Sequence, residues 1–443
     1  MTITMLHGDC TELLPTLPPA SAQCIVTSPP YFGLRDYGLP PTLWPAIEFV
    51  PMAGLPSITI PAMSCCLGLE SDPLAYIGHL VHVFRLARPA LRDDGTAWLN
   101  LGDSYAQDSK WGGHSGGKNY TSDAGGISRE RKRTGLKDKN LMMIPARAAL
   151  ALQADGWWLR NQAIWWKPNA MPESVSDRLT NDYEPVYLLA KSARYFFDAA
   201  AIAEPAVATE NRGGGRKIQN LVTGPGQKND GFKDRWRPST TRNRRTVWRI
   251  PTQPLPDEHY APWPEALAEL CIRAGSGAQA CEHCGAAWAR VVEQGMPSAD
   301  SERPQARRAA ELWVEKGMTD AHLAALRAVG FADAGKAQKT MTGYGKNTPE
   351  VMQLAVEAKA ALGGYLRELL SGAPVTTGFQ PACTCAGNTG SAASVVLDMF
   401  AGSGTTLRVA ERLQRNSIGI DLNGDYLKIQ ERRTNGVQVE LFV

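Results

Sequence analysis

One segment near the carboxyl terminus, VVLDMFAGSGTTLRVAERLQRNSIGID, constrains the fold more than any other part of the chain. Its pattern predicts a buried strand over Val395–Met399, a tight glycine loop over Phe400–Gly404 and a helix over Thr405–Leu413. A second strand follows over Ser417–Ile420 and ends at Asp421. This order indicates a nucleotide-type cofactor site in an α/β sheet. Glycines let the backbone approach a ligand, a helix amino terminus offers free N–H groups, and the acid can accept from ribose hydroxyls.

The glycine loop matches neither of the two common phosphate-binding patterns. It is not G-x-G-x-x-G and not G-x-x-x-x-G-K-[ST], so a dinucleotide site and a P-loop ATP site are both disfavoured. An ordinary βα turn, in which Gly402 and Gly404 serve packing alone, is the alternative. We favour the cofactor site because a second strand with a terminal acid accompanies the loop.

A second motif, Ser28-Pro29-Pro30-Tyr31, directly follows a predicted strand over Cys24–Thr27. Open α/β sheets bind ligands at the carboxyl ends of their strands, where this tetrapeptide would lie. The prolines make the turn rigid, so Ser28 Oγ and the Pro29 carbonyl present two acceptors beside the aromatic face of Tyr31. This suits a planar group with an exocyclic NH₂, which would donate two hydrogen bonds and stack on the ring. A proline-rich strand exit with a core tyrosine is the alternative.

Composition divides the chain into three stretches. Residues 1–273 and 395–443 read as α/β, whereas 274–394 shifts to Ala, Glu, Arg and Lys and predicts helices. Neither flank makes a complete sheet alone. We therefore expect one α/β sheet domain built from both flanks, with 274–394 as a mostly helical insertion.

Two segments in the first stretch, 108–140 and 211–249, read as loops rich in glycine and basic residues. The segment 211–249 has eleven Lys and Arg against Asp230 and Asp234, a local charge of +9 in a chain whose formal charge is only +3. Such a strip can contact phosphates and read guanine edges. A solvated flexible loop is the alternative. The arginines predicted to contact nucleic acid are Arg235, Arg237, Arg242, Arg244 and Arg245.

The cysteines predict a metal site. Cys281 and Cys284 form a C-x₂-C pair followed by glycine, and Cys383 and Cys385 form a C-x-C pair. We expect a Cys₄ structural zinc that joins the two ends of the insertion. His283 is an alternative ligand, and four unligated thiols are the alternative to any metal site.

Composition also excludes several classes of protein. No apolar run approaches the roughly 20 residues that span a bilayer, and the first residues lack the pattern of a signal peptide. The nine cysteines are odd in number and unevenly spread, unlike a disulfide framework. We expect a soluble, cytoplasmic protein with no membrane partner.

Together, Ser28-Pro29-Pro30-Tyr31 and the FAGSG loop resemble motifs of the DNA amino-methyltransferases that use S-adenosylmethionine. The tetrapeptide precedes the loop, as in the permuted subgroup called β. Further stretches that match are HGDCTELL, LRDDGTAWLNLGDSY, GWWLRNQAIWWKPNAMPESVSDRLTNDYEPVYLLAKSARYFFD and RTVWRIPTQPLPDEHYAPWPEALAELCI. The resemblance implies a permuted, doubly wound Rossmann-like methyltransferase sheet. Residues 1–273 would be its catalytic part with the basic loops, 395–443 its cofactor-binding part, and 274–394 an insertion that could assist target recognition.

The resemblance also assigns roles to residues. Ser28, Pro29, Pro30 and Tyr31 would hold the target amino group. Asp9 would accept from the adenine amino group of the cofactor, although its position equally fits a helix cap before Thr11. The remaining cofactor-binding assignments are Asp398, Phe400, Ala401, Gly402, Ser403, Gly404, Thr405 and Asp421.

The implied activity is transfer of a methyl group from S-adenosylmethionine to an exocyclic amino group of a base flipped out of double-stranded DNA. Serine at position 28 favours cytosine N4, since relatives that act on adenine N6 more often carry aspartate or asparagine there. Methylation at cytosine C5 is disfavoured because the chain has no Pro-Cys dipeptide. A cognate restriction enzyme, as in a restriction–modification system, is a candidate partner whose existence the sequence does not decide.

Several alternatives stay open at this point. They are adenine N6, an RNA or protein amide substrate, and a catalytically idle DNA-binding protein. The channel to the base is expected to be lined by Trp165, Trp166 and Lys167. The alternative is that the tryptophans are core residues, which we expect of at least one of them.

Overall fold

The computed structural model describes residues 1–33, 36, 38–106, 135–205, 241–253, 263–296, 304–329, 348–369, 374–434 and 437–438. Its chain divides into two compact units. The sheet unit comprises Met1–Ile202, Arg245–Ala289 and Gln380–Val443, and the second unit comprises Ala203–Arg244 and Arg290–Phe379. The cysteine pairs at the two ends of the expected insertion therefore lie in the sheet unit.

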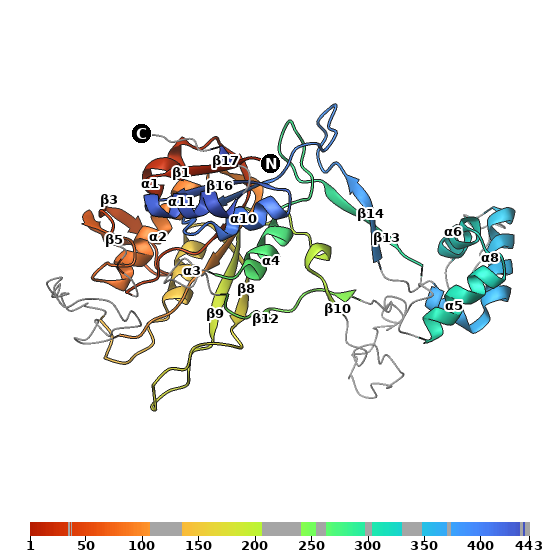
Figure 1. Ribbon diagram of the computed structural model, residues 1–443, viewed down its shortest axis with the longest axis horizontal. Coiled ribbons are helices and arrows are strands. Elements are labelled where there is room, and N and C mark those ends of the chain that lie inside the picture. The colour runs from red at the N-terminus through yellow and green to blue at the C-terminus, as the bar shows by residue number, and fades with distance from the viewer. Residues whose placement is uncertain are drawn as a thin grey trace. The chain divides into compact units, whose positions relative to one another are not determined.

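The sheet unit is built on one large sheet (Figure 1). Within the described part of the chain it has nine strands in the order β12-β8-β9-β7-β2-β15-β16-β1-β17. Their bounds are β1 Ile3–His7, β2 Ala22–Thr27, β7 Leu91–Asn100, β8 Trp158–Trp166, β9 Tyr183–Ala190, β12 Val247–Arg249, β15 Val395–Asp398, β16 Asn416–Asp421 and β17 Val437–Gln438. Among these described strands, only β9 runs antiparallel to its neighbours.

Strands from the two ends of the chain alternate in the centre of this sheet. The late strands β15 and β16 lie between β2 and β1, and Figure 1 shows red β1 beside blue β16. Neither end of the chain can complete the sheet without the other. The predicted α/β class, with a permuted doubly wound sheet and a mostly helical insertion, is confirmed.

Helices cover both faces of the sheet because its central strands are buried on both sides. All six residues of β2 are buried, as expected of a strand covered by helices on each face. Alternate side chains enter different cores: Ile25 packs with helices α2 and α3, and Val26 packs with α4 and α10. The helices of this unit are α1 Cys10–Leu13, α2 Pro73–Ala87, α3 Ile144–Ala154, α4 Glu265–Gly275, α10 Thr405–Arg412 and α11 Gly424–Arg433, with one-turn helices at Leu14–Thr16 and Ala200–Ile202.

Two small antiparallel sheets complete the sheet unit. Strand β3 (Thr42–Trp44) pairs with β6 (Met63–Cys65), and β4 (Ile47–Phe49) pairs with β5 (Ile58–Ile60). Trp44 and Phe49, from these sheets, join the same core cluster as α2.

The second unit contains helices and two short ribbons. Strand β10 (Glu204–Pro205) pairs with β11 (Thr241–Arg242), and β13 (Ala289–Gln294) pairs with β14 (Pro374–Gln380). The helices are α5 Pro304–Glu315, α6 Asp320–Val329, α8 Pro349–Leu362 and α9 Leu366–Leu369, with a single turn at Gly363–Tyr365. They form their own core around Trp313, Leu326 and Leu362. No helix in the described ranges is long and apolar enough to cross a membrane.

Candidate active site

A cavity of about 420 Å³ opens where β1, β2, β15 and β16 end. It is lined by the tetrapeptide Ser28–Tyr31, by Phe400–Ser403 of the glycine loop, and by Asp9 and Asp421. The volume falls within the roughly 300–1,000 Å³ of sites that enclose a small organic ligand. Both sequence motifs therefore line one cavity.

The two motifs meet because their strands are neighbours. Strand β2 pairs in parallel with β15, with Cys24 opposite Val396 and Ile25 opposite Leu397. Parallel strands end at the same edge of a sheet, so the tetrapeptide after β2 and the loop after β15 emerge side by side. Residues some 370 positions apart in sequence thus share one site.

Asp398, the last residue of β15, joins the two motifs. Its Oδ1 accepts from Thr27 Oγ1 at 2.7 Å and from the Phe400 N–H at 3.1 Å, and its Oδ2 accepts from Thr406 Oγ1 at 2.6 Å. Burial raises the pKa of Asp398 to about 6, while these hydrogen bonds act to lower it. The carboxylate thereby ties the end of β2 to the glycine loop and to helix α10.

Asp421, at the end of β16, holds the glycine loop from the other side. Its Oδ2 accepts from the Gly402 N–H at 2.6 Å and its Oδ1 accepts from the Asn423 N–H at 2.8 Å. Burial raises the pKa of Asp421 to about 6, although the same N–H groups act to lower it. The strand over Ser417–Ile420 with its terminal acid is placed as the sequence predicts, within β16.

The two loop glycines have different roles. At Gly402 (φ +51°) a Cβ would meet no atom within 4 Å, so the backbone there faces open space in the cavity. At Gly404 (φ +78°) a Cβ would lie 2.8 Å from Gln430 Cγ, so the residue must be glycine where α10 begins. Of the predicted cofactor residues, Gly404 alone does not line the cavity.

Ser403 and Thr405 line the cavity but use their hydroxyls elsewhere. Arg433 Nη1 donates to the Ser403 carbonyl and Oγ, each at 2.8 Å, and lies 3.3 Å from Thr405 Oγ1. Gln430 Nε2 donates to the Gly402 carbonyl at 2.7 Å. Helix α11 therefore fixes the shape of the loop, a role that the sequence did not reveal.

Asp9 is both a helix cap and part of the cavity wall. Its Oδ1 accepts from the N–H and the hydroxyl of Thr11, each at 2.8 Å, and caps α1; its Oδ2 accepts from Thr42 Oγ1 at 2.5 Å. The cap that the sequence left as an alternative is thus present. A carboxylate has about four lone-pair sites, so capping leaves acceptor capacity on the cavity side.

Tyr31 belongs to a polar network at the tetrapeptide. Its hydroxyl lies 2.9 Å from Asn100 Oδ1 and 2.8 Å from Glu184 Oε2, and Asn100 Nδ2 donates to the same Glu184 oxygen at 3.1 Å. Lys167 forms an ion pair with Glu184. Burial, and then the charge of Glu184, raise the pKa of Tyr31 well above its usual range, so the phenol is neutral.

The oxygens of the tetrapeptide differ in the hydrogen bonds that they already make within the protein. Tyr76 Oη donates to the Pro30 carbonyl at 2.8 Å, whereas no donor from the described residues bonds the Pro29 carbonyl. Ser28 Oγ has only long contacts, 3.4 Å to Tyr31 Oη and 3.3 Å to Asn100 Oδ1. Both predicted acceptors therefore keep capacity for a ligand.

Asn100 and Glu184 are the polar groups that sequence reasoning missed. Asn100 ends β7 and Glu184 lies in the antiparallel strand β9, so only the sheet order brings them to Tyr31. Trp165 is buried in the core and also borders the cavity, with Lys167 Nζ 4.5 Å from its ring centre. Trp166 is more exposed and donates to Asp182 at 2.9 Å. The expectation that at least one tryptophan is a core residue is confirmed.

The predicted nucleic-acid arginines fall in different parts of the chain. Arg235 and Arg237 lie outside the described residues, as does most of 108–140 and 211–249. Arg242 in β11 pairs with Glu204 at 2.8 Å, with both side chains mostly buried. Arg244 is partly exposed and Arg245 is exposed. A phosphate would have to compete with Glu204 for Arg242.

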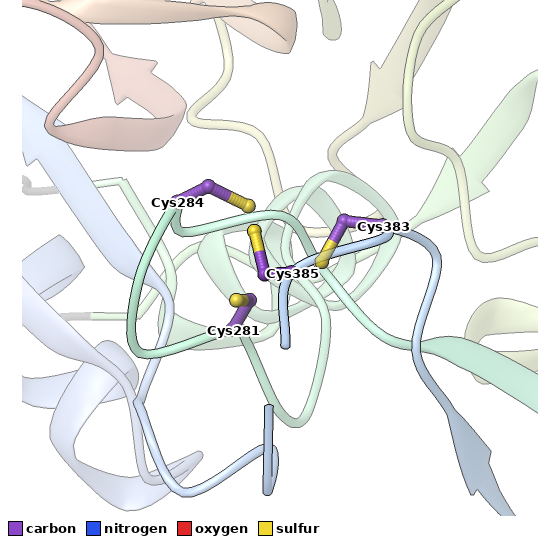
Figure 2. Close-up of side chains that lie close together, drawn as sticks. All are labelled: Cys281, Cys284, Cys383 and Cys385. Carbon is purple, nitrogen blue, oxygen red and sulfur yellow. The ribbon is translucent and has the colours of Figure 1, made fainter. Parts of the chain in front are cut away.

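The four predicted metal-ligating cysteines converge in the sheet unit (Figure 2). The Sγ atoms of Cys281, Cys284, Cys383 and Cys385 all lie within 4.8 Å of one another, and none forms a disulfide. His283 is not part of this cluster; its backbone N–H contacts Cys281 Sγ at 3.4 Å.

The sequence of this chain is similar to those of known DNA methyltransferases. The family model described as DNA methylase, of N6 and N4 methyltransferases, matches residues 22–279 and 389–432, more than half of the chain. The type II methyltransferase M.SmaI of Serratia marcescens is 38% identical over 274 residues, covering 61% of this chain and 75% of the relative. M.Cfr9I of Citrobacter freundii, also a type II methyltransferase, is 37% identical over 273 residues, covering 62% and 72%.

Solved structures resemble the chain only weakly. The PvuII DNA methyltransferase (cytosine-N4-specific) gives a TM-score of 0.44 at 12% identity, with 99% of this chain and 89% of that chain covered. A likeness of this size has no bearing on fold or function, so the assignment depends on the sequence matches. The chain belongs to the DNA methylase family, which confirms its predicted resemblance to S-adenosylmethionine-dependent DNA amino-methyltransferases.

Proposed function

We propose that the protein methylates the exocyclic N4 of a cytosine flipped out of double-stranded DNA, with S-adenosylmethionine as the methyl donor. The observation that carries this proposal is that Ser28–Tyr31 and Phe400–Ser403, from adjacent strands, line the same cavity. A base held by the first motif and a cofactor held by the second would lie next to each other. Proximity of this kind removes much of the entropic cost of a two-substrate reaction.

The tetrapeptide would hold the amino group. An exocyclic amino nitrogen is a poor nucleophile because its lone pair is delocalised into the ring. Ser28 Oγ and the Pro29 carbonyl would accept its two hydrogens and favour a pyramidal nitrogen with an available lone pair. The ring of Tyr31 would stack on the base and replace the stacking lost on flipping. The links of Tyr31 to Asn100 and Glu184 support this by fixing the hydroxyl end of the ring.

The glycine loop and the acids around it fit the cofactor. Open space at Gly402 admits a ligand against the backbone, and the carboxylate of the half-buried Asp421 lies beside it. Asp421 would accept from ribose hydroxyls and Asp9 from the adenine amino group. When bound, S-adenosylmethionine supplies a methyl group on a positively charged sulfur. Asp398 would position the loop through Thr27 and Thr406 rather than touch the ligand.

The choice of cytosine N4 is supported by the serine at position 28, where relatives that act on adenine N6 more often carry aspartate or asparagine. The DNA substrate is supported by the basic segment 211–249 and by Lys167 at the cavity. The type II names of the relatives support a place in a restriction–modification system, with a partner endonuclease. A DNA methyltransferase of this kind would act in the cytoplasm.

The test is methyl transfer to unmethylated plasmid DNA from S-adenosylmethionine with a deuterated methyl group, followed by digestion and mass spectrometry of the nucleosides. We expect labelled N4-methylcytosine. Labelled N6-methyladenine would overturn the assignment of the base. Bound cofactor with no labelled nucleoside would overturn the DNA substrate, and RNA and protein would then be tested by the same label.

A single substitution tests whether formation of the methylated nucleoside depends on the tetrapeptide. Ser28→Ala removes one acceptor for the amino group while leaving the strand and both prolines intact. We expect bound S-adenosylmethionine at unchanged affinity and a loss of about 10²-fold or more in turnover, the usual cost of one lost transition-state hydrogen bond. Full activity of this variant would contradict the role of Ser28.

A further inference from the structure

The four converging cysteines lie near the amino ends of β2 and β15, whereas the cavity lies at the carboxyl ends of the same strands. Cys281 and Cys284 follow α4, and Cys383 and Cys385 follow β14, where the chain leaves and re-enters the sheet unit around residues 290–379. Figure 2 shows the sulfur atoms of the two pairs directed toward one another. We propose that these four cysteines bind one structural zinc ion, and that this centre holds the amino ends of β2 and β15 in place through Gln23. The inference does not depend on the proposed function.

The geometry of the sulfur atoms suits tetrahedral zinc. Zinc–thiolate bonds of about 2.3 Å place the four sulfurs of a tetrahedral site about 3.8 Å apart. The Sγ atoms here lie within 4.8 Å of one another and are all unpaired thiols, so a small contraction completes the site. Cys281 is buried, Cys284 is exposed, and Cys383 and Cys385 are half-buried, as expected of a site at the edge of a domain.

The backbone around the first pair is shaped as a knuckle. The Gly285 N–H donates to the Cys281 carbonyl at 2.8 Å, and the Cys281 N–H donates to the Ala286 carbonyl at 2.9 Å. Gly285 has φ +68°, and a Cβ there would lie 2.8 Å from Gln23 Nε2. Glycine is therefore required for this turn and for the close approach of Gln23.

Donors around the cluster point at the sulfurs. The His283 N–H lies 3.4 Å from Cys281 Sγ, and Asn388 Nδ2 lies 3.3 Å from Cys383 Sγ. Arg92 Nη1 donates to the Cys284 carbonyl and brings a positive charge next to the site. A zinc ion with four thiolates has a net charge of −2, which such donors and a cation stabilise.

The two halves of the cluster are also joined by hydrogen bonds outside the cysteines. Glu282 accepts from the Thr389 N–H at 2.7 Å and from Thr389 Oγ1 at 2.9 Å. Trp288 Nε1 donates to Asn388 Oδ1 at 3.0 Å. These contacts hold the first pair beside the second in the geometry that a shared metal ion needs.

Gln23 connects this centre to the two strands that lead to the cavity. It is the second residue of β2 and is almost fully buried. Its Nε2 donates to the Gly285 carbonyl at 2.9 Å, and its Oε1 accepts from the N–H of Val395, the first residue of β15. One side chain thus joins the knuckle to the amino ends of both β2 and β15.

The metal is tested on the untagged full-length protein by elemental analysis for zinc and iron. We expect one zinc and no iron per chain, and Co²⁺ exchanged into the site should give the absorption bands of a tetrahedral thiolate complex. Folded protein without zinc, or with iron in its place, would overturn the proposal. The double variant Cys383→Ser/Cys385→Ser should lose the zinc, while Cys271→Ala, which changes a buried cysteine outside the cluster, should keep it. If the double variant is insoluble, the cobalt spectrum of the unmodified protein tests the ligands instead, and a spectrum without the bands of a tetrahedral thiolate complex would overturn the proposal.

The holding role is tested by hydrogen exchange on the full chain before and after zinc is removed with a metal chelator, since a thiol reagent would also modify Cys24 of β2. Removal should speed exchange in peptides that cover β2 and β15 but not in those that cover β8 and β9. Gln23→Ala should keep one zinc per chain and already show the faster exchange. Unchanged exchange in β2 and β15 after either treatment would overturn the holding role.

Discussion

Tyr31 illustrates how much of the site depends on single atoms. Its hydroxyl lies between Asn100 Oδ1 and Glu184 Oε2, and Glu184 in turn pairs with Lys167. A hydroxyl has one proton, so it donates to one of these acceptors at a time while Asn100 Nδ2 bonds the same carboxylate. The ring is held by its polar end and leaves its face for stacking.

Two variants of Tyr31 separate the contribution of its ring from the contribution of its hydroxyl. Tyr31→Ala should bind S-adenosylmethionine with unchanged affinity but lose about 10- to 100-fold in kcat/KM for DNA, because stacking on an aromatic ring contributes about 1–3 kcal/mol per base. Tyr31→Phe, which keeps the ring, should lose less. Steady-state kinetics and calorimetry of cofactor binding measure both, and equal activity of Tyr31→Ala would remove the residue from the site.

Gly402 offers a test of where the cofactor lies. A side chain at this position would project into open space in the cavity, and φ there is +51°. Gly402→Trp should therefore abolish S-adenosylmethionine binding while the protein stays folded. Calorimetry measures affinity, circular dichroism provides the control for folding, and unchanged affinity would refute the placement.

Asp421 should make cofactor affinity depend on pH. Burial raises its pKa to about 6, and ribose hydroxyls bind best to the ionised carboxylate. Below pH 6 the protein must release a proton to bind, so affinity should fall by up to about tenfold per pH unit as pH decreases, and level off above pH 6. Calorimetry between pH 5 and 8 measures this, with Asp421→Asn as the variant that should bind weakly and lose most of the dependence. An affinity of the unmodified protein that rises as pH falls would contradict the role.

At the scale of secondary structure, the site depends on where adjacent strands end. Asp398 links three elements, since its oxygens accept from Thr27 at the end of β2, from the loop, and from Thr406 in α10. The link is buried, so loss of one donor leaves a carboxylate oxygen without a partner and without water.

Thr406→Val is the clean test of this link because it replaces the hydroxyl by a methyl group of similar size. We expect it to lower the free energy of unfolding by about 1–3 kcal/mol, the usual cost of a buried polar group left unsatisfied. Thr406→Ser keeps the hydroxyl and should lose less. Urea unfolding followed by the signal of the sheet unit measures both. A Thr406→Val variant as stable as the unmodified protein would show that Asp398 does not depend on Thr406.

The segment after residue 395 was predictable almost to the residue because its signals are local. Strand β15, the glycine loop, α10 and β16 all follow from short runs of apolar residues, glycines and an acid. Asn100 and Glu184 were not predictable. Each is an ordinary polar residue in a strand, and its place beside Tyr31 follows from the order β9-β7-β2, which no local pattern encodes. The same holds for Gln23, whose partners Gly285 and Val395 are distant in sequence.

At the scale of the molecule, the cavity belongs wholly to the sheet unit. All the residues that line it lie within Met1–Ile202, Arg245–Ala289 and Gln380–Val443. Because no described residue of 290–379 lines the cavity, we expect cofactor binding not to depend on that segment.

Deleting Arg290–Phe379 tests this division. The Arg290 guanidinium lies 5.0 Å from the centre of the Phe379 ring, so the two ends of the deleted segment are close and a short Gly-Ser linker can join Ala289 to Gln380. The shortened protein should bind S-adenosylmethionine within about threefold of the full chain, because its cavity is intact, whereas a deletion of Val395–Val443 should abolish folding by removing β15 and β16. Calorimetry measures the first outcome. Loss of cofactor binding in a folded deletion variant would show that the second unit supports the cavity.

The alternation of early and late strands has a consequence for synthesis of the protein. Ser28 emerges from the ribosome some 370 residues before Asp398, a delay of about 20–75 s at 5–20 residues per second. Until the last strands are made, β2 lacks β15 on one side and β1 lacks both of its neighbours, β16 and β17, and unpaired strand edges are prone to aggregate. Chains released early by interrupted translation should therefore be bound by chaperones and degraded by proteases, whereas completed chains should be stable.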